Sequence, residues 1–221
     1  MTAIELHPRI IENKDWATVV FIIAISFIVV AKTSFEKRYN DFVRIIVSDK
    51  YTKIYRESSH LMSGFNVLLF TINVISLSFF IQLVLFYYGY AEKNDWIMYV
   101  RIFTLLNIFI LSKFLVEKII AVFFGVEELV EQFNLQKVNY RTYVGLLLLP
   151  VSIILFYTNN LTNSLILTLI FTLLTINTMI YMVFLKNYQN LLISKLFYFI
   201  LYLCALEIAP YYFIYYLITK N

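Results

Sequence analysis

The stretch LMSGFNVLLFTINVISLSFFIQLVLFYY, residues 61–88, decides the fold class of this chain. It contains no charged residue, and it is longer than the roughly 20 residues that an α-helix needs to cross a hydrocarbon core of about 30 Å. Apolar and polar residues do not alternate along it, as they would in the strands of a membrane β-barrel. The stretch therefore predicts a membrane-spanning α-helix.

Further apolar runs precede and follow this one, which gives six predicted spans in a single membrane domain, residues 1–221. The spans are expected at residues 16–33, 61–88, 96–116, 142–158, 165–185 and 196–217. The chain is 61% hydrophobic and only 14% charged, whereas a soluble domain is about half apolar and about a quarter charged. The sequence therefore predicts an all-α, polytopic transmembrane helical bundle.

The composition also restricts the chemistry. One cysteine, Cys204, excludes an intrachain disulfide and a cysteine-cluster metal site, and two histidines are too few for a His-rich site. The motifs HExxH, GxSxG, GxGxxG and the P-loop do not occur. We therefore expect no metal, no cofactor and no catalytic residue. The net charge of +4 is interpreted through its distribution across the membrane, and no nucleic-acid partner is expected.

Basic residues are distributed unequally between the two sides of the predicted bundle. The connections over residues 32–60, 113–141 and 186–195 hold thirteen of the 18 lysines and arginines, and the opposite side holds four. The positive-inside rule places the richer side in the cytoplasm and both termini on the other side. Aromatic residues, which favour membrane interfaces, gather at the predicted outer ends of the spans. They are Trp16, Trp96, Tyr87, Tyr88, Tyr157, Tyr211, Tyr212, Tyr215 and Tyr216.

Two of the basic connections are predicted to be amphipathic helices. In residues 35–54 the apolar side chains recur at helical spacing, and basic side chains, among them Lys37, Arg38 and Arg44, occupy much of the remainder. Such a helix either lies in the headgroup plane, facing lipid or a partner, or extends the first helix and packs on its neighbours. Residues 117–143 also have helical periodicity, which predicts an amphipathic helix or a re-entrant elbow between the third and fourth spans.

One acidic residue lies at membrane depth. Glu207 is near the middle of the sixth span, and Arg101 lies about 7 Å inside the outer end of the third span. Charged groups in the bilayer face a bundle interior or a hydrated cavity, and an arginine side chain can reach toward a partner. We expect Glu207 to face inward and to be held by Arg101 or by polar groups of the second span, and an Arg101–Glu207 ion pair would be either a fixed lock or a titrating or ion-coordinating site. Pro210 is expected to kink the helix beside Glu207.

Other polar residues within the spans form stripes. Asn66, Asn73 and Ser76 share roughly one face of the second span, with Gln82 on another face. The fifth span carries a stripe of threonines at positions 168, 172 and 175. Such stripes usually mediate helix packing and hydrogen bonds, and a polar substrate path is the alternative. Lys113 and Glu117, four residues apart, are expected to mark a solvated helix exit.

Four stretches together carry a resemblance to a known family. They are FNVLLF at 65–70, VEQFNLQKVNYRTYVGLLLLP at 130–150, LKNYQNLL at 185–192 and LFYFILYLCALEIAPYY at 196–212. The chain resembles an uncharacterised family of Bacteroidota multi-pass inner-membrane proteins, a domain of unknown function, from the first span to the C-terminus. The resemblance implies a bacterial inner-membrane location and a role in the envelope, and it transfers no catalytic residue.

Three functional hypotheses remain open at this point. The first is a non-catalytic subunit or assembly factor of an envelope complex, with membrane lipids and other inner-membrane proteins as partners. The second is a small proton- or ion-coupled transporter that uses Glu207 and Arg101, although no internal repeat of the kind that many transporters carry is evident. The third, an enzyme acting on a lipid-linked substrate, lacks the clustered carboxylates or histidines that it would need.

Overall fold

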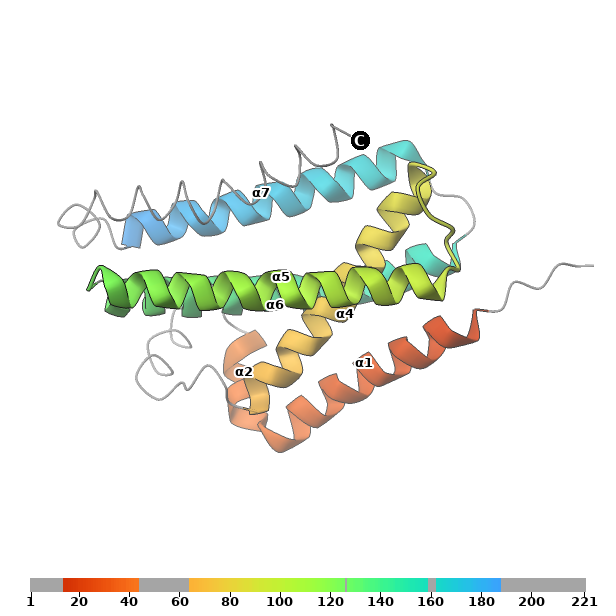
Figure 1. Cartoon of the computed structure of the whole chain (residues 1–221). Coiled ribbons are helices and arrows are strands. Elements are labelled where there is room, and N and C mark those ends of the chain that lie inside the picture. The colour runs from red at the N-terminus through yellow and green to blue at the C-terminus, as the bar shows by residue number, and fades with distance from the viewer. Residues whose placement is uncertain (1–13, 44–63, 126, 159–161, 188–221) are drawn as a thin grey trace, which may run out of the picture.

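The computed structural model describes residues 14–43, 64–125, 127–158 and 162–187 (Figure 1). These residues form six α-helices and no strand, which confirms the all-α prediction for this part of the chain. The helices are α1 (Asp15–Ser34), α2 (Glu36–Val43), α4 (Gly64–Tyr87), α5 (Trp96–Phe123), α6 (Glu127–Tyr157) and α7 (Asn163–Asn187).

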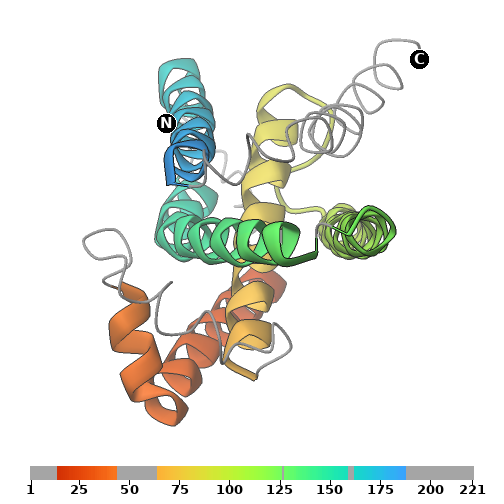
Figure 2. The ribbon, with the colours of Figure 1, turned by 90° about the vertical axis from the view of Figure 1, so that its left-hand side faces the viewer.

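Helix α4, which contains most of the stretch that predicts the fold class, lies at the centre of the bundle. It contacts α1, α5 and α6, and its contact with α6 is the most extensive of the described structure; Figure 2 shows the two helices crossing. In the most apolar part of α4, 61% of the residues are buried, compared with 22% in α1. A helix that is hydrophobic on all sides belongs in the interior of a bundle, so the composition of α4 matches its place.

Three described helices are long and apolar enough to cross a membrane: Asp15–Ser34, Gly64–Tyr87 and Lys137–Tyr157. They correspond to the predicted first, second and fourth spans. A shorter apolar helix, Asn163–Met179, forms most of the predicted fifth span, and α5 covers the predicted third. The predicted sixth span lies outside the described residues, so the total of six remains a prediction.

The connection between α5 and α6 differs from the prediction. Instead of a separate amphipathic helix or elbow over residues 117–143, α5 continues to Phe123, and α6 begins at Glu127 and runs without interruption to Tyr157. The reversal occurs at Gly125, whose φ of +61° is one that residues with a side chain rarely adopt. At 1.5 Å per residue, α5 and α6 are about 42 and about 46 Å long, so they are longer than a hydrocarbon core of about 30 Å.

The connections that the sequence places outside the membrane meet at one end of the bundle. Trp16 Nε1 donates to Asn94 Oδ1 at 2.9 Å, and Lys93 Nζ donates to the carbonyl oxygen of Thr158 at 2.6 Å. These bonds join the start of α1, the loop after α4 and the end of α6. Trp16 and Trp96 also pack together here, with ring centroids 6.4 Å apart. Trp16, Trp96 and Tyr157 of the predicted aromatic set therefore lie near one another, since the Tyr157 hydroxyl is 2.6 Å from Thr18 Oγ1 on α1.

Helix α2 lies at the opposite end and packs on the bundle. Phe42 is buried, with its ring centroid 5.9 Å from that of Phe65 on α4 and 6.0 Å from that of Tyr143 on α6. Phe35, at the junction of α1 and α2, lies 5.7 Å from Phe65. Over Glu36–Val43 the contacts of Phe42 favour the packed extension, and the remainder of the predicted segment lies outside the described residues. The apolar stripe of α2 covers protein, so these rings are not available to insert into lipid.

Candidate functional site

A buried ionic cluster joins α5 to α6. Glu117 is only 1% exposed, and its Oε1 accepts a hydrogen bond of 2.9 Å from Lys137 Nζ. Lys113 Nζ lies 4.0 Å from the same oxygen. The sequence predicted the Lys113–Glu117 pair but placed it at a solvated helix exit, which is wrong. The pair is enclosed because α6 continues alongside α5 and brings Lys137 over the carboxylate.

This cluster is suited to holding two helices together. Two charges removed from water are stable only when both are present and well placed, since removal of one leaves an uncompensated buried charge. Lys137 and Glu117 come from helices on either side of the Gly125 turn, and their bond fixes the register of the hairpin. The cluster of Lys113, Glu117 and Lys137 is therefore best described as a structural tie between α5 and α6.

A second group of buried polar side chains lies at the crossing of α4 and α6. A Cβ atom at Gly145 would collide with Asn73 Oδ1 and would lie 2.8 Å from Asn73 Cα, so only glycine permits this approach of the two helices. Asn73 Oδ1, Ser76 Oγ and, on α6, Ser152 Oγ are buried and have no hydrogen-bond partner among the described residues. We call Asn73, Ser76, Gly145 and Ser152 the crossing seam.

The crossing seam carries hydrogen-bonding capacity but no charge. Buried amide and hydroxyl groups normally bond to protein or to ordered water, so unpartnered ones mark a place that water or a small polar species can enter. Among the described residues, no group of three or more His, Cys, Asp and Glu side chains is arranged to hold a metal ion. The chemistry that the seam itself offers is thus neutral hydrogen bonding.

The asparagines predicted to share a face are separated in the structure. Asn66 Oδ1 accepts a hydrogen bond of 3.1 Å from Arg38 Nη2, and the Arg38 guanidinium lies 4.9 Å from the centre of the Phe65 ring. Asn66 thus contacts α2, two turns from Asn73 at the crossing seam. Lys37 is exposed, and Arg44 lies outside the described residues. Partial burial raises the pKa of the neighbouring Tyr39 phenol above its usual value.

Two further predictions concern α5 and α7. Arg101 is exposed on α5, and its proposed partner Glu207, like Pro210, lies outside the described residues, so the ion pair remains a prediction. Within the described residues, no hydrogen bond from the threonine stripe on α7 to another helix is seen. The hydroxyls of Thr168, Thr172 and Thr175 instead donate to the carbonyl oxygens four residues earlier on the same helix, at 2.6–2.8 Å.

Gln82 has a clear role in the end loop. Its Nε2 donates to the carbonyl oxygen of Asp95 at 2.8 Å, and Asp95 in turn caps α5 by accepting from the Met98 backbone nitrogen at 3.1 Å. The side chain is 1% exposed. The sequence predicts that Gln82 lies on a different face of the helix from Asn73 and Ser76. In the structure, Gln82 holds the loop between α4 and α5.

Sequence reasoning missed two residues that organise these regions. Gly145 is a small residue within an apolar helix, a known signal for close helix contact, and that signal was available. Lys137 is 20 residues from Glu117 along the chain, and no local spacing connects residues on either side of a turn that was itself not predicted.

Comparison with known proteins places the chain in a family. A family model described as "Domain of unknown function (DUF4271)" matches residues 17–218. The chain belongs to this family. The match confirms the resemblance to an uncharacterised domain family and covers nearly the whole sequence. The DUF4271 domain includes the tie, the crossing seam and the stretch that contains Glu207. No curated protein and no solved structure matches the chain.

Proposed function

We propose that this DUF4271 protein is a non-catalytic subunit or assembly factor of a bacterial envelope complex. It would span the inner membrane several times, with both termini on the periplasmic side. Support for a membrane location comes from the three described helices that are long and apolar enough to cross a bilayer. The orientation rests on the excess of lysine and arginine in the connections at the opposite end from Trp16.

The observation that carries this proposal is the exposed face of α5. Leu105 and Ile119 are 66% and 67% exposed, and Ile108 and Leu115 lie between them at 58% and 57%. These four residues are three, seven and four positions apart, so they lie along one side of the helix, as residues at a helix-packing seam do. Arg101 lies on the same face, one turn before Leu105, and is also exposed.

An exposed arginine favours protein rather than lipid as the neighbour of this face. If α5 crosses the bilayer, Arg101 lies about 7 Å from its outer end, and a charged group there is costly to leave against hydrocarbon. A partner helix that offers a carboxylate or backbone carbonyls would satisfy it. Residues 196–217, with Glu207, could supply that helix from the same chain, and a partner protein would then pack at the rim.

The second candidate function is a small proton- or ion-coupled transporter. The observation that favours it is the crossing seam, because Asn73, Ser76 and Ser152 place unpartnered polar atoms in the most buried part of the bundle. A hydrated path along this seam would need a titrating group, and Glu207 with Arg101 is the predicted one.

Purification in mild detergent separates the two candidates. We expect a stoichiometric partner to co-elute with the wild-type chain and to be lost when Arg101→Met is combined with Leu105→Ala. The matched control is Ile25→Ala, since Ile25 is an exposed apolar residue on α1. A chain that elutes without a partner and, in liposomes, carries a flux that requires Glu207 would contradict the subunit and support the transporter.

A further inference from the structure

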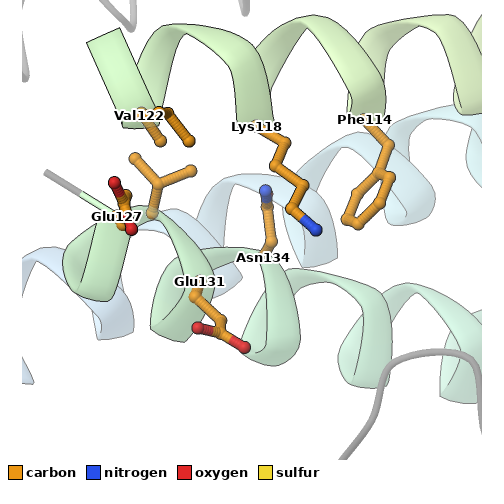
Figure 3. Close-up of a pocket in the computed structure, with 8 residues that line it drawn as sticks. Phe114, Lys118, Val122, Glu127, Glu131 and Asn134 are labelled. Carbon is orange, nitrogen blue, oxygen red and sulfur yellow. The ribbon is translucent and has the colours of Figure 1, made fainter. Parts of the chain in front are cut away.

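A small cavity opens between the end of α5 and the beginning of α6 (Figure 3). Its volume is about 140 Å³. Helix α5 contributes Phe114, Lys118, Ala121 and Val122, and α6 contributes Glu127, Val130, Glu131 and Asn134. The cavity therefore combines one basic side chain, two acidic side chains, one amide and an apolar wall. It is separate from the crossing seam, and none of the three residues of the ionic tie lines it.

The depth of this cavity matches the headgroup region of a bilayer. The membrane-spanning part of α6 begins at Lys137, and all four α6 residues of the cavity precede it. At 1.5 Å per residue, Asn134 and Glu127 lie about 4 and about 15 Å beyond the end of the span. The headgroup layer extends about 5–7 Å beyond the hydrocarbon on each side. Asn134 therefore lies at headgroup depth. The carboxylates of Glu127 and Glu131 lie farther toward the aqueous side, in the direction in which the ammonium end of a headgroup extends from its phosphate.

Asn134 indicates that the cavity has an unsatisfied ligand-binding group. Its side chain is 3% exposed, and its Oδ1 has no hydrogen-bond partner. A buried amide oxygen without a partner costs free energy unless a polar species reaches it. In Figure 3, Asn134 points up from α6 toward the cavity, and Lys118 reaches down from α5 on the same side. The two side chains together offer N–H donors for an anionic group and a carbonyl oxygen for a cationic one.

The charges of the cavity fit a zwitterion better than a simple ion. Lys118 opposes a bare metal cation, and the carboxylates of Glu127 and Glu131 oppose a bare anion. A phosphate ester bonded to Lys118 and Asn134, with its ammonium group on the side of Glu127, satisfies both signs. Phe114 and Val122 supply the apolar wall of the cavity, and Phe114 lies on the side of the apolar N-terminal part of α5.

We propose that this cavity binds the headgroup of an ethanolamine-type phospholipid. A primary ammonium at the Glu127 side of the cavity can donate up to three hydrogen bonds to carboxylate oxygens, whereas a trimethylated choline headgroup can donate none. Selectivity for the ethanolamine headgroup follows from those donors. The proposal rests on the membrane location argued above and does not depend on the role as a subunit.

The test is lipid retention by the full-length protein, purified in detergent and exchanged into nanodiscs that contain equal amounts of phosphatidylethanolamine, phosphatidylcholine and phosphatidylglycerol. Bound lipid is counted by native mass spectrometry. We expect retention of phosphatidylethanolamine to exceed that of phosphatidylcholine by about tenfold, since loss of two or more charge-assisted hydrogen bonds has at least that effect. Glu127→Gln with Glu131→Gln should remove this preference, and Lys118→Met should lower retention of phosphatidylethanolamine.

Matched controls come from charged residues outside the cavity. Glu92→Gln changes an exposed carboxylate at the other end of the bundle, and Lys32→Met changes an exposed lysine near the end of α1. Both should leave the lipid preference unchanged. Thermal denaturation of each variant shows whether it is folded. If the double variant Glu127→Gln, Glu131→Gln does not fold, Glu127→Gln alone is tested in its place.

Three results would overturn the proposal. The first is equal retention of the three lipids by the wild-type chain. The second is a preference for phosphatidylethanolamine that survives all the cavity substitutions, which would place the lipid elsewhere. The third is displacement of bound lipid by soluble phosphoethanolamine at equal affinity, which would assign the cavity to a free phosphoamine. Each result is read from bound lipid, so it stands whether or not a partner protein co-elutes in the purification described above.

Discussion

The ionic tie and the crossing seam bury polar groups in opposite ways. In the tie, Glu117 is enclosed and meets Lys137 at 2.9 Å, so both charges have an opposite charge at contact distance. At the seam, Asn73 and Ser76 are enclosed with side-chain oxygens that have no partner, while the backbones approach closely at Gly145. The difference shows that a buried charge requires a designated partner, whereas a neutral group can be tolerated where close helix packing compensates for it.

The tie should show the largest effect of substitution. Glu117→Gln or Lys137→Met alone leaves an uncompensated charge, and each should lower the free energy of unfolding by about 3–5 kcal/mol. The double change should cost much less than the sum of the two single changes. Thermal denaturation in mild detergent provides the measurement. If the loss of unfolding free energy in the double variant equals the sum of the losses in the two single variants, the pair is not coupled.

The crossing seam should respond to volume rather than to charge. Gly145→Ala places a methyl group against the backbone of Asn73 and should cost about 1–3 kcal/mol. Gly64→Ala is the matched control, since a Cβ there would meet Phe35 Cζ at an ordinary 3.6 Å. We expect the control to be neutral in the same denaturation assay. Equal stability of the two variants would mean that α4 and α6 do not approach as closely as described.

The smallest effects on stability are expected at two serines of α4, one with a hydrogen-bond partner and one without. Ser76 and Ser78 are both fully buried in α4, but only Ser78 Oγ donates, at 2.7 Å to the Val74 carbonyl oxygen. Ser78→Ala should cost about 0.5–1 kcal/mol, and Ser76→Ala should be neutral or stabilising. A stable Ser76→Ala variant that loses biological activity would sharpen the comparison, because it would indicate that the seam serves as a polar path and so favour the transporter.

The sequence predicted helices more successfully than it predicted their contacts. The long apolar stretches at 16–33 and 61–88 correspond to α1 and α4 because a helix that satisfies its own backbone is the open-chain structure that suits a bilayer. The continuation of α5 beyond residue 116 was missed, because the charges at Lys113 and Glu117 resemble an exit to solvent. Their burial depends on Lys137, which only the three-dimensional path of α6 brings near.

The candidate sites were less predictable for the same reason. Asn73 was identified from the sequence as a polar group in a span, but its proximity to Gly145 depends on how two helices cross. The cavity at Asn134 requires a reversal at Gly125 that sets α5 beside α6. A single sequence provides periodicity within each helix but no distance between helices.

The proposed topology places the two ends of the bundle on opposite sides of the inner membrane. Tyr90, 78% exposed in the loop after α4, and Lys37, exposed on α2 at the other end, are suitable labelling positions. Each is changed to cysteine in a Cys204→Ser background and treated with an impermeant thiol reagent in cells whose outer membrane has been permeabilised. We predict labelling at position 90 while the inner membrane is intact, and labelling at position 37 only after the inner membrane is disrupted. Labelling of both positions from the same side, or the reverse pattern, would contradict the account.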